Sequence, residues 1–183
     1  PADARISGTI VAAPVNGADV SVVDSSGNVV VETVKTDAGG QYSLVIPNGS
    51  LAQDLIIKST GGIFTDEATG NSGTAGEMYA YASAGSLSNG SVVSATPGST
   101  IIAELVMNHG KTTTEAETVF AAALGYTPDM SVNPADATTA PAADETDVET
   151  LAGFRAGAFS QLAMDLGLSQ DDQFALFAAL AQD

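Results

Sequence analysis

The first half of the chain consists of short runs rich in β-branched residues, and a turn sequence ends almost every run. Asn16-Gly17 and Ser26-Gly27-Asn28 are two of these turns, and glycine and asparagine adopt the backbone angles that tight turns require. The run 18–23 between them alternates apolar with polar residues, which is typical of a strand with one buried and one wet face. We therefore predict six strands, at Ile6–Ala12, Ala18–Val23, Val29–Thr36, Tyr42–Ile46, Leu55–Ser59 and Met78–Ser83. Short strands at this spacing favour an antiparallel β-sandwich.

Beyond residue 96 the pattern changes to helical spacing. Pro97-Gly98-Ser99-Thr100 precedes the apolar run 101–107, and Asn108-His109-Gly110 follows that run as a helix end would. A short first helix is therefore predicted.

The spacing of Thr112 and Glu115 matches a capping box, in which each side chain satisfies a backbone N–H of the other residue. It predicts a second helix that runs through Leu124 and stops at Gly125. The apolar residues expected on its inner face are Val119, Phe120, Ala123 and Leu124.

A helical hairpin is expected at the end of the chain, after a connection at 127–144 that is rich in Pro, Ala and Asp and lacks periodicity. Gly167 separates the two predicted helices. The first carries an apolar stripe of Leu151, Phe154, Ala158, Leu162 and Leu166, and the second carries Phe174, Phe177, Ala178 and Ala181. We interpret the stripe as intramolecular core, and a partner-binding face is the alternative.

These patterns predict a mainly β chain with some α-helix, divided into a β-sandwich domain at 1–96 and a helical extension at 97–183. A length of 183 residues suits one good core or two small ones.

The formal net charge of −17 arises because the chain has only five lysine and arginine residues. Such a chain is repelled by a phosphate backbone and by an anionic lipid surface, so nucleic acid is excluded as a partner. No apolar run approaches the roughly 20 residues of a membrane span. The dispersed acids favour a well-solvated surface.

The sequence begins with Pro1 and contains no cysteine. A removed secretory signal is the simplest account of that first residue, and we expect a secreted or cell-surface protein. Without cysteine, an extracellular chain is stabilised by core packing and strand pairing and not by disulfides.

Two stretches of the first half carry a family resemblance. Residues 17–28 contain Gly-Ala and Asp-x-x-Gly, and residues 36–49 contain Thr-Asp-x-x-Gly-x-Tyr and Pro-x-Gly. This spacing resembles the carboxypeptidase regulatory-like domain, a transthyretin-like and Cna-B-related β-sandwich of bacterial surface proteins. The resemblance covers about half of the chain and implies an Ig-like or transthyretin-like sandwich used for structure, adhesion or assembly.

Residues for catalysis are sparse. His109 is the single imidazole, and no Gly-x-Ser-x-Gly elbow accompanies it, which disfavours a nucleophilic triad. The paired carboxylates Asp66-Glu67, Asp144-Glu145 and Asp171-Asp172 are adjacent in sequence, so the two side chains of each pair point apart. The chain also lacks tryptophan, which commonly lines sugar clefts. We expect a protein that is not an enzyme.

Calcium is the one ion that the sequence suggests, and no other cofactor is expected. Asp24, Ser26 and Asn28 present oxygens at alternating positions, and Asp37 adds a further carboxylate. Turn formation is the competing interpretation of all four residues.

The leading hypothesis from the sequence is a self-assembling subunit of an extracellular filament or surface matrix. Copies of the chain would associate through sandwich edges or exchanged strands, with Ile6 and Ile10 of the first strand inserted into a neighbour. Other surface proteins or glycans are further partners under this hypothesis. The alternative is a monomeric adhesin or a calcium- or carbohydrate-binding accessory module.

Overall fold

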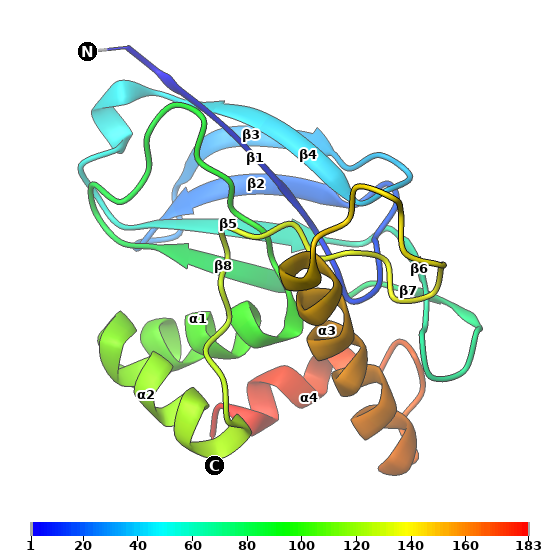
Figure 1. Cartoon of the computed structure of the whole chain (residues 1–183). Coiled ribbons are helices and arrows are strands. Elements are labelled where there is room, and N and C mark those ends of the chain that lie inside the picture. The colour runs from blue at the N-terminus through cyan, green and yellow to red at the C-terminus, as the bar shows by residue number, and fades with distance from the viewer. Residues whose placement is uncertain (1, 183) are drawn as a thin grey trace.

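A computed structural model of the chain describes residues 2–182, and in this part the strands form three antiparallel sheets (Figure 1). One sheet has four strands in the order β3-β2-β5-β8, and two smaller sheets pair β1 with β4 and β6 with β7. The strands are β1 (Ala4–Thr9), β2 (Asp19–Asp24), β3 (Val29–Lys35), β4 (Gln41–Ile46), β5 (Leu55–Thr60), β6 (Ile63–Thr65), β7 (Ser72–Thr74) and β8 (Met78–Ala82). All six strands predicted from the sequence are present, although the first runs from Ala4 to Thr9 and not from Ile6 to Ala12.

Strand β1 has a partner on each side. Its residues pair with β4 in the register Ile6↔Leu44, and segment 91–95 bonds to its other edge through Val93 N to Ser7 O at 2.7 Å. Segment 91–95 approaches β1 closely, since a Cβ placed on Gly8 would lie 1.8 Å from the carbonyl oxygen of Val93. Glycine is therefore required at this position, and β1 is an interior strand.

The second half of the described chain contains four α-helices: α1 (Pro97–His109), α2 (Thr113–Leu124), α3 (Asp147–Asp165) and α4 (Gln173–Leu180). A capping box starts each of the first three, and the pair Thr112 and Glu115 acts as predicted. Helix α1 begins at Pro97, a turn earlier than the apolar run suggested, because proline suits the first helical position.

The helices lie together on the β8 side of the sheets (Figure 1). One hydrophobic cluster contains Ile57 of β5, Ile101 of α1 and Phe177 of α4, so residues 2–96 and 97–182 share a single core. The expected boundary coincides with the start of α1, but it does not separate two cores. The fold is mixed α and β, with antiparallel sheets and four helices in the described residues.

Two details differ from the sequence-based prediction. The hairpin β6–β7 was not predicted, because its strands have three residues each and only Phe64 is buried between them. The ring of Phe64 packs edge-on against Phe174 of α4 at 5.5 Å between centroids. Burial of this hairpin thus depends on a helix more than a hundred residues away, which no local pattern reveals.

The predicted inner faces of two helices are also wrong in part. On α2, Phe120 is buried, but Val119 and Leu124 are 43% and 42% exposed. On α3, Leu151 and Phe154 point outward, and the buried residues of this helix are Gly153, Ala156, Phe159, Ser160 and Ala163. Helix α3 packs by its face of small residues, because a Cβ on Gly153 would lie 2.3 Å from the carbonyl oxygen of Ala135. Only glycine fits at this contact between α3 and the backbone of Ala135.

Candidate functional site

The open edge of the four-stranded sheet is the first candidate site. Strand β3 pairs only with β2, and among residues 2–182 no hydrogen bond satisfies the backbone groups on its outward edge. Val29 at the start of this strand is 65% exposed, and Glu32 and Thr33 are exposed as well. An edge with free N–H and C=O groups and exposed apolar area is a template for pairing with another strand.

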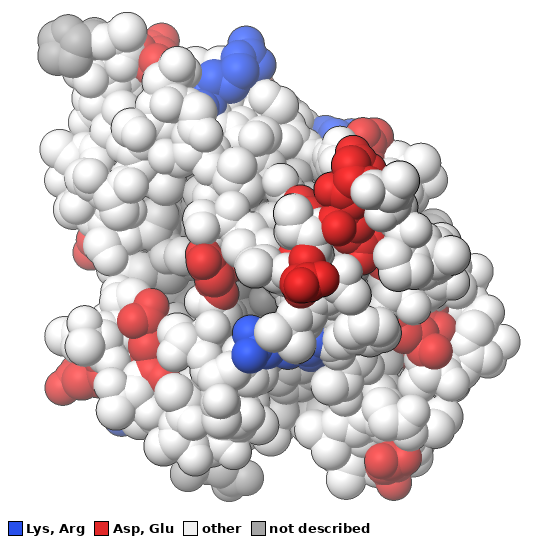
Figure 2. Space-filling view, in the orientation of Figure 1, with Lys and Arg blue, Asp and Glu red and all other residues white. Residues whose placement is uncertain are grey.

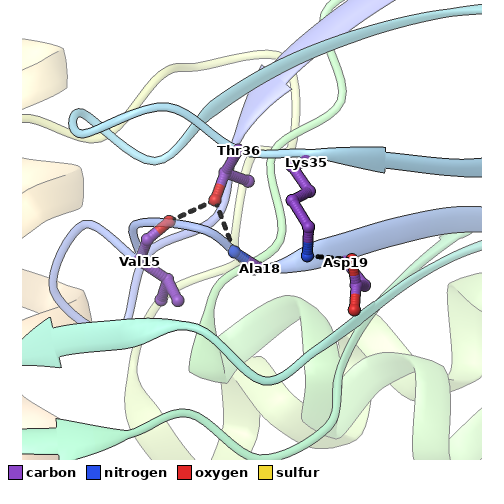
Figure 3. A network of polar contacts seen from close by, with 5 residues as sticks. All are labelled: Val15, Ala18, Asp19, Lys35 and Thr36. Atoms are coloured by element: carbon purple, nitrogen blue, oxygen red, sulfur yellow. Dashed lines mark hydrogen bonds and ion pairs between the residues drawn. The ribbon is translucent and has the colours of Figure 1, made fainter.

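The far end of β3 is fixed in place by Thr36 (Figure 3). The buried hydroxyl of Thr36 donates to Val15 O at 2.5 Å and accepts from Ala18 N at 2.9 Å. Beside it, Lys35 forms an ion pair with Asp19 of β2 at 2.7 Å between Nζ and Oδ1. The edge strand is therefore held rigidly against β2 at this end, and a partner strand would meet an ordered edge.

The structure corrects the role expected for Ile6 and Ile10. Both side chains are 0% exposed in this chain's own core, and β1 has backbone partners on both sides. The expectation that these two side chains insert into a neighbouring copy is therefore wrong, because they fill this chain's own core and β4 and segment 91–95 cover both edges of the strand. Replacing either isoleucine by aspartate would test folding and not assembly.

The calcium candidates are divided between two turns. The Oδ1 atom of Asp24 accepts hydrogen bonds from Ser26 N and Asn28 N at 2.9 Å, in the turn that precedes β3. Asp37 occupies the turn that follows β3, where its Oδ1 accepts from Gly39 N and Gln41 N at 2.9 Å. The seven residues of β3 separate the turns by about 23 Å, so the four residues do not form one site.

Both turns are shaped by hydrogen bonds that backbone N–H groups donate to the carboxylates, as the competing interpretation expects. Within residues 2–182, no group of three or more His, Cys, Asp or Glu side chains is arranged to hold a metal ion. Calcium binding by the Asp24 turn stays a prediction.

The structure contains a buried polar cluster that the sequence patterns did not predict. The hydroxyl of Ser160 on α3 donates to Glu67 Oε2 at 2.8 Å, and Gln173 Nε2 of α4 donates to Asp66 Oδ2 at 3.1 Å. Ser160 and Gln173 are 1% and 0% exposed, so the cluster joins the β6–β7 hairpin to both helices. The hydroxyl of Ser160 is therefore out of reach of a substrate. One signal of a buried serine was available in the sequence. Ser160 is four residues after Ala156 and three before Ala163, so the three residues lie on the same side of the helix.

Glu67 is the electrostatically unusual member of this cluster. Burial raises the pKa of Glu67 to about 7, the bond from Ser160 opposes the shift, and the charges of Asp66 and Asp136 add to it. Within the described chain its Oε1 atom is buried without a hydrogen-bond partner. Below about pH 7 the neutral form of the Glu67 carboxyl is therefore favoured over the charged form.

The other residues considered for chemistry lie apart from one another. His109 is exposed at the end of α1, as predicted, and Gly110 follows it in the left-handed conformation. Asp171 accepts a hydrogen bond from Thr74 N at 2.7 Å, which again is a structural contact.

No protein-family model, curated protein sequence or solved structure matches the chain. Of the helices in residues 2–182, none combines the length and the apolar character needed to cross a membrane. The function therefore has to be argued from the geometry.

Proposed function

We propose that this protein is a non-catalytic structural subunit that associates with copies of itself through the open edge of its four-stranded sheet. The observation that carries the proposal is β3, whose outward backbone groups lack partners among residues 2–182 and whose first residue, Val29, is 65% exposed. An extracellular filament or matrix is the assembly that we propose.

The energetics favour association once charge is screened. Each aliphatic side chain buried between strands contributes about 1.5–3 kcal/mol, and the ladder of backbone hydrogen bonds adds to it. The net charge of −17 on each copy opposes association. Acidic groups are scattered over the visible face, and few basic groups accompany them (Figure 2). Salt screens charges beyond about 8–10 Å at physiological strength, so assembly should strengthen as salt is added.

The sandwich interpretation belongs to the same proposal. The packing of the β1–β4 pair and the four-stranded sheet around one core supports a transthyretin-like or Ig-like arrangement, as in the surface-protein domains that the sequence resembles. A secreted or cell-surface location is proposed with it, as in the surface-protein domains that the sequence resembles.

Lysine substitutions on the edge test the proposal. Val29→Lys with Thr33→Lys places two charges on β3, and lysine on an edge strand opposes strand addition. Sedimentation velocity in moderate salt should show large species for the wild type and smaller species for the variant. The matched control is Ala122→Lys on the exposed surface of α2, which adds positive charge away from the sheet and should assemble like the wild type.

A wild-type chain that stays monomeric at high concentration in salt and calcium would contradict the proposal. That result would favour the alternative, a monomeric binding module. The observation that speaks for this alternative is a cleft of about 390 Å³ between α1, α3 and the connection, where Arg155 stacks on Tyr126 at 4.3 Å from the ring centre.

A further inference from the structure

Helix α3 carries an exposed apolar face that nothing in residues 2–182 covers. Val148, Leu151 and Phe154 are 60%, 48% and 60% exposed. At 100° per residue they share one side of the helix with Asp147 and Arg155, opposite the small residues that face the core. Val148, Leu151 and Arg155 also line the cleft of about 390 Å³, so the face continues into a hollow.

We propose that this face binds the same face of a second copy, in an antiparallel two-fold pair of α3 helices centred on Leu151. A two-fold interface presents the same patch on both subunits, so a residue on the axis meets itself. Residues equally far from Leu151 on either side then face one another. Phe154 of each copy meets the partner's Val148, at the rim of the partner's cleft.

The charges of α3 fit this register. Arg155 is four residues after Leu151 and Asp147 is four residues before it, so each arginine faces the partner's Asp147. Arg155 is one of only five basic residues in the chain, and no carboxylate in residues 2–182 lies within 4 Å of it. Its guanidinium lies over the Tyr126 ring at 4.3 Å, a contact that does not use up its five N–H donors, so donors are left for a carboxylate. The pairing thus supplies a carboxylate for a cation that has none within 4 Å in residues 2–182.

A second copy suits this face because it presents an arginine and an aspartate at matching distances from Leu151, although the net charge of −17 on each copy opposes the pairing until salt screens it. Only three apolar side chains of each copy form the centre of the interface, so we expect a weak dimer that dissociates on dilution. The interface is separate from the β3 edge and does not rest on the function proposed above. A chain that used both interfaces would join dimers into larger assemblies.

Sedimentation equilibrium of the full chain tests the inference. Leu151→Asp places two carboxylates together on the axis, and Phe154→Ala removes an aromatic ring that a two-fold interface contains twice. Each should weaken the dimer by at least about tenfold. The matched control is Leu166→Asp, which is also exposed but lies about 22 Å along the axis from Leu151 and should leave the dimer unchanged. Circular dichroism verifies that each variant is folded.

Charge reversal gives the sharper test. Arg155→Asp chains and Asp147→Arg chains each bring like charges together in their own dimers, so each should be monomeric alone. When the two variants are mixed, both cross-pairs become opposite in charge, and a heterodimer should form. A wild type that is monomeric at all concentrations, a dimer that survives Leu151→Asp, or a mixture that fails to associate would each overturn the inference. The β3 variant Val29→Lys with Thr33→Lys should keep the dimer, which separates this interface from the edge.

Discussion

Ser160 on α3 donates its hydroxyl hydrogen to Oε2 of Glu67, at 2.8 Å, and thereby joins the β6–β7 hairpin to the helical half of the chain. The other oxygen of Glu67 is buried and has no hydrogen-bond partner among residues 2–182. Burial raises the pKa of this carboxyl to about 7, which makes its ionisation costly for the folded state.

This raised pKa predicts that the protein loses stability between about pH 4.5 and pH 7. The contribution of neutral Glu67 is fully present below its ordinary pKa of 4.5 and is lost as the pH rises through the folded value of about 7. The difference corresponds to about 3 kcal/mol at most. Glu67→Gln should therefore stabilise the chain at pH 8 and leave it nearly unchanged at pH 4, as measured by urea unfolding. The control is Glu32→Gln on the exposed surface of β3, and equal pH dependence in the wild type and Glu67→Gln would contradict the prediction.

Tyr42→Phe should lower the free energy of unfolding by about 1–2 kcal/mol. The hydroxyl of Tyr42 donates to Val93 O at 2.6 Å, in a buried position that ties β4 to segment 91–95. Its loss leaves a buried carbonyl without this donor. Tyr79→Phe is the matched change on the surface, where the hydroxyl bonds to Glu77, and it should cost less than about 0.5 kcal/mol. Equal losses for both variants in denaturant unfolding would argue against the role of segment 91–95.

Gly8→Ala should destabilise the chain strongly, by about 3 kcal/mol or more, because the new Cβ would lie 1.8 Å from a backbone oxygen. Segment 91–95 would have to move away from β1 and expose its second edge. Gly49→Ala is the control, since no atom lies within 4 Å of a Cβ there, and its Tm should be unchanged or slightly higher. Thermal unfolding of the two variants distinguishes them, and a Gly8→Ala chain with wild-type Tm would refute the close approach.

A chelator should change the Tm only slightly, because the oxygens of Asp24 already accept bonds from Ser26 N, Asn28 N and Asn28 Nδ2. Asp24→Ala should accordingly lower the Tm by the same amount with and without calcium. Calorimetry in the two conditions measures this. A large loss of stability in chelator alone would show that the turn holds a cation.

Local patterns in the sequence predict the strands and the helix starts well. The capping box of Thr112 and Glu115, and the turn at Asp24, each depend on residues that are close in sequence. The choice of face on α3 could not be predicted in this way, because two faces of that helix have helical spacing. The large residues suggested one face, whereas close packing at Gly153 selected the other.

Sheet edges were harder to predict than strands. The first strand looked free because it lies at one end of the sequence, yet segment 91–95 returns to cover it. Strand β3 lies at an edge of the four-stranded sheet instead, and this position depends on the spatial order of the strands and not on their order along the chain. The polar cluster of Glu67, Ser160 and Gln173 likewise joins residues from three distant segments.

Electron microscopy of the concentrated wild-type chain in moderate salt tests the central claim most directly. Pairing of β3 with β3 joins copies two by two, and together with the α3 face it predicts ordered, extended assemblies that become longer as salt is raised and that disappear with Val29→Lys and Thr33→Lys. Uniformly dispersed single particles under all salt conditions, with no difference between wild type and variant, would contradict it.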